Sequence, residues 1–494
     1  MALASTPRLG AGRGLTGLGF ALGARALGVW RRRPHYGPAP AGPTIEGPLG
    51  RLEQALELGA LESAQELLPA LRAELDAMRR NAPFRARASI AAIDTLLMLG
   101  EVAEARELAV RDRLLLERTA QGCGRLESLG EACPLRAADG GWNFLGASRQ
   151  LASGALDAQQ LTSLVGGTFW PCLAKPELAL LFFSTLWSSE PQRALDFLGA
   201  FLTTQGLACR FRIDAVGAEL EALARLRSSA PRRPARGPLV SVIVPAYQAA
   251  STLAYALESL LVQTHGAIEI LVGDDASKDG TLEVMRRFAD EPRVRLFRSL
   301  ENQGAYNLRN QLAAQARGDW LTFHDADDWA LPSRIASQLA TLRSTKARAV
   351  VTGLLRLTPH GHVVFGKNQR ATRLSRVSLM LRRESFLALD GFRSVRVGGD
   401  YELAAKLTAT WGGRALARIK PPLMLCRSSS DSAIGSADTE ARADGYRSPV
   451  RRAYCQLVFH RYVQAAPLTD EAIDERLRDF GNWQTPSDLL ELRR

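Results

Sequence analysis

Cysteines and long apolar runs are both scarce in this sequence. Its 494 residues include six cysteines, which form no CxxC pair and have no histidine partners at the spacing of zinc sites. We therefore expect reduced thiols and a cytoplasmic location instead of a disulfide framework. No apolar stretch approaches the roughly 20 residues that a membrane-spanning helix needs. The sequence thus predicts no transmembrane segment.

Acidic residues are missing from the first part of the chain. Residues 1–45 carry arginines among many glycines, alanines and prolines. Gly12, Gly14 and Gly17 match the dinucleotide-binding pattern GxGxxG, but no predicted strand precedes them, so we reject that function. The composition predicts a disordered basic leader. A peripheral contact with anionic lipid at the inner face of the cell membrane is the functional alternative.

Basic residues exceed acidic ones over the whole chain. The 63 lysines and arginines against 51 aspartates and glutamates give a net charge of +12 and a pI near 9.8. This balance favours anionic partners. A nucleic-acid surface would need basic side chains interleaved with exposed aromatics. The arginines cluster instead in the leader and in residues 228–237, so we expect no nucleic acid as a partner.

Residues 46–227 have helical periodicity throughout and predict an all-α domain. The segment LGALESAQEL at 58–67 recurs loosely as LGEVAEAREL at 99–108, an offset of about 41 residues. This resembles degenerate tetratricopeptide-like repeats, and residues 189–202 offer a further copy. A plain helical bundle explains the pattern equally well. Either arrangement can bind a protein partner, and the proline-punctuated basic residues 228–237 predict a linker after it.

From residue 238 the pattern changes to short apolar strands that alternate with helices. We predict strands at 239–244, 269–272, 294–297 and 320–323, with helices at 249–263, 281–288 and 306–316. This alternation indicates βαβ units and a largely parallel sheet in a domain spanning residues 238–430. Ligands bind such sheets beyond the carboxyl ends of the strands. A polar cluster follows each predicted strand: Tyr247-Gln248, Asp274-Asp275, Asn302-Gln303-Gly304, and Asp325 to Asp328.

The segment WLTFHDADDW at 320–329 ends a strand in three carboxylates. Because side chains alternate along an extended strand, Asp325 and Asp327 should leave it on the same side, a few ångströms apart. Two carboxylates that close raise each other's pKa unless a cation lies between them. Their oxygens suit Mg²⁺ or Mn²⁺, which could bridge to a phosphate. The alternative is an acidic turn before a helix at Pro332, with Asp328 near the N-terminus of that helix.

Residues 238 to about 430 resemble the family 2 glycosyltransferases of the GT-A fold. The segment VSVIVPAYQAA is similar to their opening VSVIIPxYN segment, LVGDDASKDGT to their DDGSxDGT segment, and NQGAYNLRNQLAAQARGDW to their NxGxxxARNxG segment. HDADDW resembles their DxD motif, and LDGF at 389–392 their GGF turn. GDYEL at 399–403 falls where they keep a Glu-Asp pair. The expected architecture is thus an α/β GT-A domain, Rossmann-like and mostly parallel, after an α-helical domain.

The resemblance implies a nucleotide-sugar donor, UDP-linked, and an acceptor hydroxyl in polysaccharide or glycoconjugate assembly. One member of the pair Asp274 and Asp275 would bind the base, although either could instead cap the following turn. Arg309 would reach the base or the phosphates, or simply belong to a solvated basic face. The full set of implied donor-binding positions is Pro245, Ala246, Tyr247, Asp274, Asp275, Arg309, Asp325 and Ala326.

The resemblance also implies roles in metal binding and catalysis. Asp325 and Asp327 would hold Mn²⁺ or Mg²⁺ against the donor diphosphate. Asp400 would be the general base, which with a single displacement implies inversion, and it could also cap the following helix. Gly399 departs from the family, where many members have Glu. Glu402 could share the acceptor contact, and Arg427 could close over the diphosphate from a mobile loop or be an ordinary surface arginine.

Three further expectations complete the interpretation. Residues 350–357 and 362–365 predict a hairpin that borders the acceptor side. Residues 431–494 predict a helical tail packed on the catalytic domain. The competing hypothesis for function is a catalytically inactive GT-A-like protein that acts through its helical region.

Overall fold

The computed structural model divides the chain into two compact units, Met1–Thr44 and Ile45–Arg494. The first unit lies outside the described residues, and so does the predicted leader. The structure describes residue 52 and the ranges 61–77, 85–99, 101–129, 133–135, 142–164, 176–213, 221–228, 237–366, 368–429, 448–462, 470–479 and 486–492, with residues 131, 137 and 484. None of the described helices is long and apolar enough to cross a membrane.

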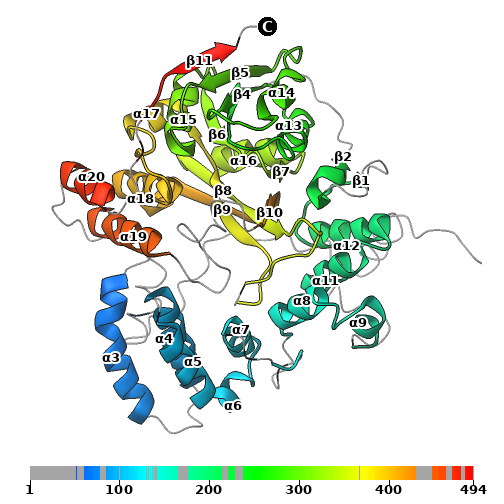
Figure 1. The fold of residues 1–494 in the computed structure, drawn as a ribbon, viewed down its shortest axis with the longest axis vertical. Helices are drawn as coiled ribbons and strands as arrows, with labels where there is room; N and C mark the ends of the chain where they lie inside the picture. Colours follow the sequence, from blue (N-terminus) through cyan, green and yellow to red (C-terminus); the bar gives the residue numbers. More distant parts are fainter. Residues whose placement is uncertain are drawn as a thin grey trace, which may run out of the picture. The chain divides into compact units, whose positions relative to one another are not determined.

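Nine strands of the described residues form one mixed sheet at the centre of the second unit (Figure 1). Its order is β11-β5-β4-β3-β6-β9-β8-β10-β7. Neighbours β5, β4, β3 and β6 are parallel, and so are β8 and β10, whereas β9, β7 and β11 pair antiparallel. The bounds are β3 Val240–Ala246, β4 Ile268–Asp274, β5 Val294–Ser299, β6 Trp320–Phe323, β7 Asp328–Ala330, β8 Ala349–Leu357, β9 Arg373–Arg382, β10 Leu416–Arg427 and β11 Leu489–Leu492.

Helices cover both faces of this sheet because alternate strand residues point to opposite sides. Val242 and Val244 of β3 share a core with α13, α14 and α16, whereas Ile243 shares one with α15, α17 and α18. These helices are α13 Leu253–Leu261, α14 Thr281–Arg286, α15 Ala305–Ala314, α16 Arg334–Thr345, α17 Arg383–Ala388 and α18 Gly399–Trp411. The predicted α/β domain with a mostly parallel sheet is confirmed.

The N-terminal part of the second unit is mainly helical. The helices are α3 Leu61–Ala77, α4 Arg85–Leu99, α5 Val102–Arg111, α6 Arg113–Leu116, α7 Ala120–Ser128, α8 Phe144–Ala152, α9 Ala158–Leu164, α11 Glu177–Leu186 and α12 Pro191–Thr204. A 3-10 turn η2, Ala222–Arg225, and a short antiparallel pair, β1 Phe211–Ile213 with β2 Leu226–Ser228, follow them. The all-α expectation missed this pair.

The helical repeat stays a prediction. Helix α4 ends at Leu99 and α5 begins at Val102, as the second copy of the motif requires. Residues 58–60 of the first copy lie outside the described residues.

The later helices share a hydrophobic core with the sheet domain. This core contains side chains of α8, α11 and α12 together with Trp329, Leu355 and Phe365. The rings of Phe144 and Phe365 stack with centroids 5.3 Å apart. Residues 229–236 of the segment predicted as a domain linker lie outside the described residues.

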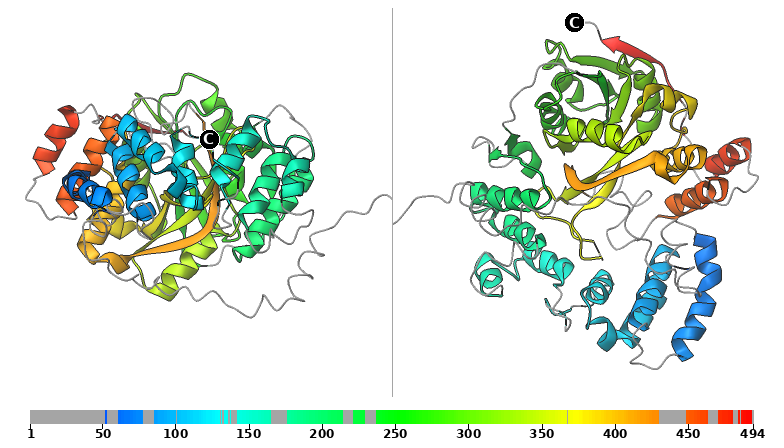
Figure 2. Two further views of the ribbon diagram at one scale, coloured as in Figure 1. Left: turned by 90° about the horizontal axis from the view of Figure 1, so that it is seen from below. Right: turned by 180° about the vertical axis from the view of Figure 1, so that it is seen from behind.

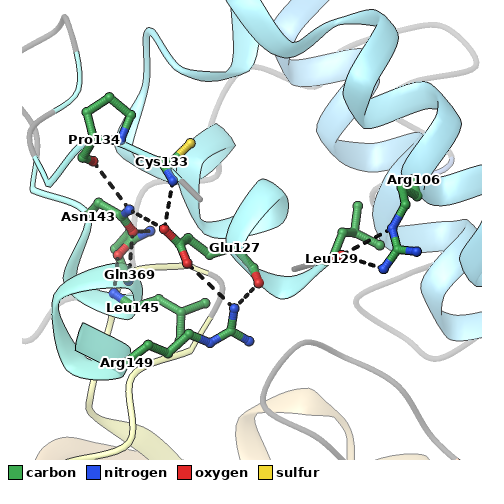
Figure 3. Close-up of polar contacts among 10 residues, drawn as sticks. Arg106, Glu127, Leu129, Cys133, Pro134, Asn143, Leu145, Arg149 and Gln369 are labelled. Carbon is green, nitrogen blue, oxygen red and sulfur yellow. Dashed lines mark hydrogen bonds and ion pairs between the residues drawn. The ribbon is translucent and has the colours of Figure 1, made fainter. Parts of the chain in front are cut away.

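Buried polar contacts reinforce this packing at the junction of α7, α8 and the loop before β9 (Figure 3). Asn143 accepts a hydrogen bond from Gly146 N at 3.0 Å and so caps α8. It also donates through Nδ2 to Glu127 Oε1 at 3.1 Å. From the sheet domain, Gln369 Oε1 accepts from Leu145 N at 3.0 Å. The backbone groups at this junction thus find partners across the boundary between the two regions.

The sheet corrects two expectations about the acceptor side and the tail. The long antiparallel partner of β8 is β9, and the predicted hairpin pairs only next to its turn. There it forms the bridge Leu357↔Val363, and Thr358 N donates to His362 O and Val364 N to Arg356 O, both at 2.9 Å. The tail contains the helices α19, Pro449–Tyr462, and α20, Asp470–Asp479, but it ends in β11, which pairs with the edge strand β5. This red strand lies beside β5 in Figure 1 and in the right-hand view of Figure 2.

Candidate functional site

The acidic motif lies on a turn, not on an extended strand as predicted. Strand β6 ends at Phe323, and Asp325 and Asp327 follow in a loop that Asp328 N closes by donating to Asp325 O at 3.3 Å. Asp328 then begins β7 and faces Cys426 of β10. The alternative interpretation is right about the acidic turn, but Asp328 lies in β7 and not near the N-terminus of the following helix, since α16 begins at Arg334. Pairing with a distant strand decided the conformation of this residue.

Burial and mutual repulsion raise the pKa of two carboxylates of the acidic motif. Burial and then the neighbouring Asp325 raise the pKa of Asp327 to about 6, against the opposing effect of Arg427 and Arg356. The pKa of Asp328 is also raised by burial and by the other two carboxylates. Asp328 accepts from Cys426 Sγ at 3.0 Å and from Arg427 N at 3.3 Å. Asp328 is thus held by β10, while the other two carboxylates belong to the loop.

The buried Arg334 donates hydrogen bonds to the residues just before the acidic motif. Arg334 is fully buried and donates to His324 Nδ1 at 2.9 Å, to Thr322 Oγ1 at 2.9 Å and to the carbonyl of Phe323 at 2.6 Å. The other ring nitrogen of His324 lies 3.1 Å from the carbonyl of Asp328. Burial and Arg334 lower the pKa of His324, as expected for a packed histidine. The guanidinium of Arg334 therefore holds the start of the acidic loop directly and its end through His324.

A chain of contacts links the acidic motif to Asp400. Arg309 of α15 is 4% exposed and pairs with Asp325 through Nη2. Its guanidinium lies over the ring of Tyr306, 5.1 Å from the centroid. The phenol of Tyr306 donates to Asp400 Oδ1 at 2.8 Å. Arg309 is thus a buried bridge and not part of a solvated basic face.

Asp400 lies in the first turn of α18 and does not cap it. The capping position is Gly398, and Asp400 is half-buried. Tyr306 explains why residue 399 is glycine where many family members have Glu, because a Cβ at 399 would lie 2.9 Å from Cδ1 of the Tyr306 ring. Tyr306 occupies the space that a larger residue at 399 would need. Sequence reasoning missed Tyr306, although it lies inside the segment NQGAYNLRN that carried the resemblance.

The structure places Glu402 away from a free acceptor surface. Its carboxylate is 1% exposed and accepts from Arg393 Nε at 2.9 Å, from the hydroxyl of Tyr462 at 3.1 Å and from the hydroxyl of Tyr454. Both tyrosines belong to α19, which lies beside α18 in Figure 1. Glu402 thus attaches the tail to the helix that carries Asp400. The predicted acceptor contact of Glu402 finds no support in this arrangement.

Replacing Tyr454 by phenylalanine should lower the free energy of unfolding by about 1–3 kcal/mol, because it leaves an oxygen of buried Glu402 without this donor. Denaturant unfolding measures the change. Tyr247→Phe is the matched control, since Tyr247 is 52% exposed and its substitution should stay within about 0.5 kcal/mol. Equal effects of the two substitutions would contradict a structural role for the Glu402 cluster.

The candidate nucleoside positions meet where β3 and β4 end. Ala246 is paired with Asp274 in the sheet, and Asp275 N donates to Ala246 O at 2.8 Å. Both oxygens of Asp275 accept backbone N–H groups, from Gln303 at 2.9 Å and from Gly304 at 2.8 Å. Gly304 has a φ of +81°, which favours glycine at this sharp entry to α15. Asp275 therefore holds the loop between β5 and α15.

Asp274 differs from Asp275 in that one of its carboxylate oxygens accepts no hydrogen bond from the described residues. Its Oδ1 accepts from Ser277 N at 3.1 Å, while buried Oδ2 has no hydrogen-bond partner among the described residues and lies 3.4 Å from Arg298 Nε. Pro245 continues β3, Ala246 ends it, and the exposed Tyr247 follows. Of the two predicted base-binding aspartates, Asp274 alone has an oxygen without a hydrogen bond in the described part of the chain, and that oxygen is buried and paired with Arg298.

Arg427 lies at the end of a strand and not on a loop. It is the last residue of β10, and its guanidinium pairs with Glu221 of the helical region. Its charge lowers the pKa of Asp327, so it lies within electrostatic reach of the acidic motif. Glu221 had no signal in the sequence, because 206 residues separate it from Arg427.

Metal binding at this site rests on the chemistry of its side chains. Among the described residues, no group of three histidine, cysteine, aspartate or glutamate side chains is arranged to hold a metal ion. Asp325 and Asp327 offer only carboxylate oxygens, the ligand type that Mg²⁺ and Mn²⁺ prefer. Burial and Asp325 raise the pKa of Asp327, so an added positive charge would favour the ionised form of Asp327. Asp325 is already paired with Arg309, and its carboxylate and that of Asp327 would be the protein ligands of a divalent cation.

Comparison with known proteins finds a family model that matches part of this chain. Residues 241–384, under a third of the chain, match the family model described as Glycosyl transferase family 2. The match runs from β3 to the start of α17 and includes the acidic loop. It does not include Asp400 or the helical region.

Relatives also match part of the chain. EpsE of Bacillus subtilis (strain 168), named as a glycosyltransferase, is 32% identical over 174 residues, 32% of this chain and 62% of EpsE. The Escherichia coli protein named UDP-Glc:alpha-D-GlcNAc-diphosphoundecaprenol beta-1,3-glucosyltransferase WfaP is 32% identical over 108 residues, 22% of this chain and 43% of WfaP. The chain thus spans less than two thirds of the length of each of these relatives.

Solved structures are more distant. TarS 1-349 of S. aureus in complex with UDP-GlcNAc is 18% identical with a TM-score of 0.38, over 49% of this chain and 71% of that one. The mannosyltransferase PcManGT from Pyrobaculum calidifontis in complex with GDP-Man and Mn2+ is 20% identical with a TM-score of 0.32, over 51% and 82%. At this distance neither structure adds to the argument.

Proposed function

We propose that the chain is an inverting, metal-dependent glycosyltransferase. It would move a sugar from a nucleotide-diphosphate donor, UDP-linked, to a hydroxyl of a glycan or glycoconjugate acceptor. The observation that carries this proposal is the chain of contacts from Asp325 through Arg309 and Tyr306 to Asp400. It connects the acidic loop, which lies within the family 2 match, to a half-buried carboxylate on another element.

The donor end of the site would be the edge where β3, β4 and β6 finish. Asp274 and the residues Pro245 to Tyr247 would contact the nucleoside, and Asp325 and Asp327 would hold Mn²⁺ or Mg²⁺. When bound, such a cation neutralises the negative charge of a diphosphate leaving group. The choice of UDP is supported by the name of WfaP, which specifies a UDP-Glc donor.

The acceptor end would be organised by Asp400. Its carboxylate would take the proton from an acceptor hydroxyl as that oxygen attacks the anomeric carbon. The hydrogen bond from Tyr306 would hold the carboxylate in one orientation during this step. A single attack from the face opposite the nucleotide inverts the anomeric configuration.

A thermal-shift panel of nucleoside diphosphates with and without Mn²⁺ tests the donor site. With UDP and Mn²⁺ together at about 100 times the dissociation constant, binding should stabilise the protein by about 2.7 kcal/mol. Asp327→Ala should abolish this stabilisation, because it removes an oxygen ligand. Asp319→Ala is the matched control, since Asp319 is an exposed aspartate just before β6. Equal stabilisation of both variants by UDP and Mn²⁺ would refute the metal site.

The competing hypothesis of an inactive interaction protein is not favoured by the comparisons. Its structural basis is also weak, because α8, α11 and α12 bury their apolar side chains in the core that they share with the sheet domain. A protein partner for the remaining helices, and a membrane contact for residues 1–45, stay predictions.

A further inference from the structure

An ion pair joins the helical region to the strand beside the acidic motif. Glu221 directly precedes the 3-10 turn η2, and Arg427 ends β10. Nε of Arg427 lies 2.6 Å from Glu221 Oε2, and Nη2 lies 2.7 Å from Oε1. The two side chains are 12% and 29% exposed. Two parallel hydrogen bonds of this kind fix the orientation of a guanidinium as well as its position.

The pair stands next to the proposed donor site. Arg427 N donates to Asp328 Oδ1 at 3.3 Å, and the charge of Arg427 lowers the pKa of Asp327. The hydroxyl of Tyr255 donates to the carbonyl of Asp327 at 2.9 Å. Burial raises the pKa of this tyrosine, and the charges of Asp327, Asp328 and Glu221 add to the effect. A carboxylate of the helical region therefore lies within electrostatic reach of the acidic loop.

The fold holds Glu221 firmly in this place. The residue after it, Ala222, is buried and donates its N–H to the carbonyl of Pro359 at 2.8 Å. The guanidinium of Arg225, at the end of η2, lies over the ring of Trp187, 5.5 Å from its centroid. These contacts hold η2 between the later helices and the loop after β8, so Glu221 has little freedom to move.

Glu221 restricts where the guanidinium of Arg427 can lie. Arg427 is a long side chain with large rotamer entropy, and three carboxylates lie close to it. Without a stronger partner, its guanidinium could fold onto Asp327 and neutralise the charge that a divalent cation needs. Glu221 occupies Nε and Nη2, while the hydroxyl of Ser429 accepts from Nη1. The guanidinium is thereby held beside the acidic loop by Glu221 and Ser429.

We propose that Glu221 is a positioning residue of the donor site, which holds Arg427 where its charge faces the donor diphosphate and leaves Asp327 free for the cation. This inference rests on the proposed function and extends it to the helical region. That region then completes the catalytic site through one side chain, in addition to any partner that it binds.

The experiment measures steady-state kinetics of glycosyl transfer with a UDP-linked sugar and Mn²⁺. Glu221→Ala and Glu221→Gln should each raise the KM for the donor about tenfold while kcat changes less than about twofold. Arg427→Ala should do the same, and the double variant should be no worse than Arg427→Ala alone, since the two residues act through one contact. Glu190→Ala is the matched control, because Glu190 forms an exposed pair with Arg193 in the same region.

A charge exchange separates positioning from mere stabilisation. The double variant Glu221→Arg with Arg427→Glu can restore the ion pair and the melting temperature. At position 427, however, a carboxylate then faces the donor diphosphate in place of the guanidinium. The donor KM should therefore stay raised. Recovery of the donor KM in the exchanged protein, or a lowered melting temperature in Glu221→Ala with an unchanged donor KM, would overturn the proposal.

The readouts also distinguish this inference from the proposed function. If UDP with Mn²⁺ stabilises both the natural protein and Glu221→Ala to the same extent, only the positioning role fails. If the natural protein neither binds a nucleoside diphosphate nor transfers sugar, both proposals fail together.

Discussion

Replacing Asp400 by asparagine is expected to lower the kcat of glycosyl transfer by about 10²–10⁴-fold, the usual contribution of a general base. Asparagine keeps the shape of the side chain, and its oxygen can still accept the hydrogen bond from Tyr306. It has no basic oxygen to receive the proton of the acceptor hydroxyl. Initial rates at saturating donor and acceptor measure the loss.

Two measurements make this result specific to the proton transfer. Stabilisation by UDP with Mn²⁺ should be the same in Asp400→Asn as in the natural protein, because the proposed donor contacts are unchanged. Asp390→Asn is the matched control, an exposed aspartate on a turn with a φ of +56°, a conformation that asparagine also tolerates. If Asp400→Asn keeps a rate similar to that of the control, another group is the base.

The strands of the domain could be predicted from the sequence because each is a short apolar run buried in the sheet. β6 has the bounds predicted for it, and β3, β4 and β5 differ from prediction by one or two residues at their ends. The polar clusters after these strands also lie together at one edge, because parallel strands present their carboxyl ends to the same side. Local pattern and sheet geometry were sufficient for this part of the site.

The rest of the site depends on contacts between residues far apart in the chain. Strand β7 forms because β10, nearly 100 residues later, supplies its partner, so Asp328 became a strand residue and Asp325 and Asp327 lie on the turn before it. Glu221 and Arg427 meet through the packing of η2 against the loop after β8. Strand β11 extends the sheet edge at β5 only after the tail has folded back. The local periodicity of the sequence cannot predict such pairings.

The fit between Gly399 and Tyr306 gives the second large expected effect. Substituting alanine for Gly399 should lower the kcat for transfer by about 10²-fold, the cost of misplacing a catalytic group by about 1 Å. The new Cβ would lie 2.9 Å from Cδ1 and 3.0 Å from Cε1 of the Tyr306 ring, closer than such atoms approach. The Tyr306 ring therefore has to move. Its hydroxyl then either displaces the carboxylate of Asp400 or loses its hydrogen bond to it.

The displacement should also reach the acidic motif. Arg309 lies over the same ring and pairs with Asp325, so movement of Tyr306 removes the support of this guanidinium. We therefore expect Gly399→Ala to weaken the stabilisation by UDP with Mn²⁺ in addition to lowering kcat. Thermal shift and initial rates, measured on the same preparation, would show the two effects together.

Gly413→Ala is the matched control for this substitution. Gly413 lies just beyond the end of α18, and a Cβ there would meet no atom within 4 Å, so the rate should not change. Adding Tyr306→Ala to the Gly399→Ala variant tests the steric explanation, because it removes the clash and also the donor to Asp400. Because Tyr306→Ala itself empties a buried position, the steric explanation predicts non-additivity: the double variant should be no less stable than Tyr306→Ala alone, while transfer stays slow. Unimpaired transfer by Gly399→Ala alone would show that Tyr306 does not set the position of Asp400.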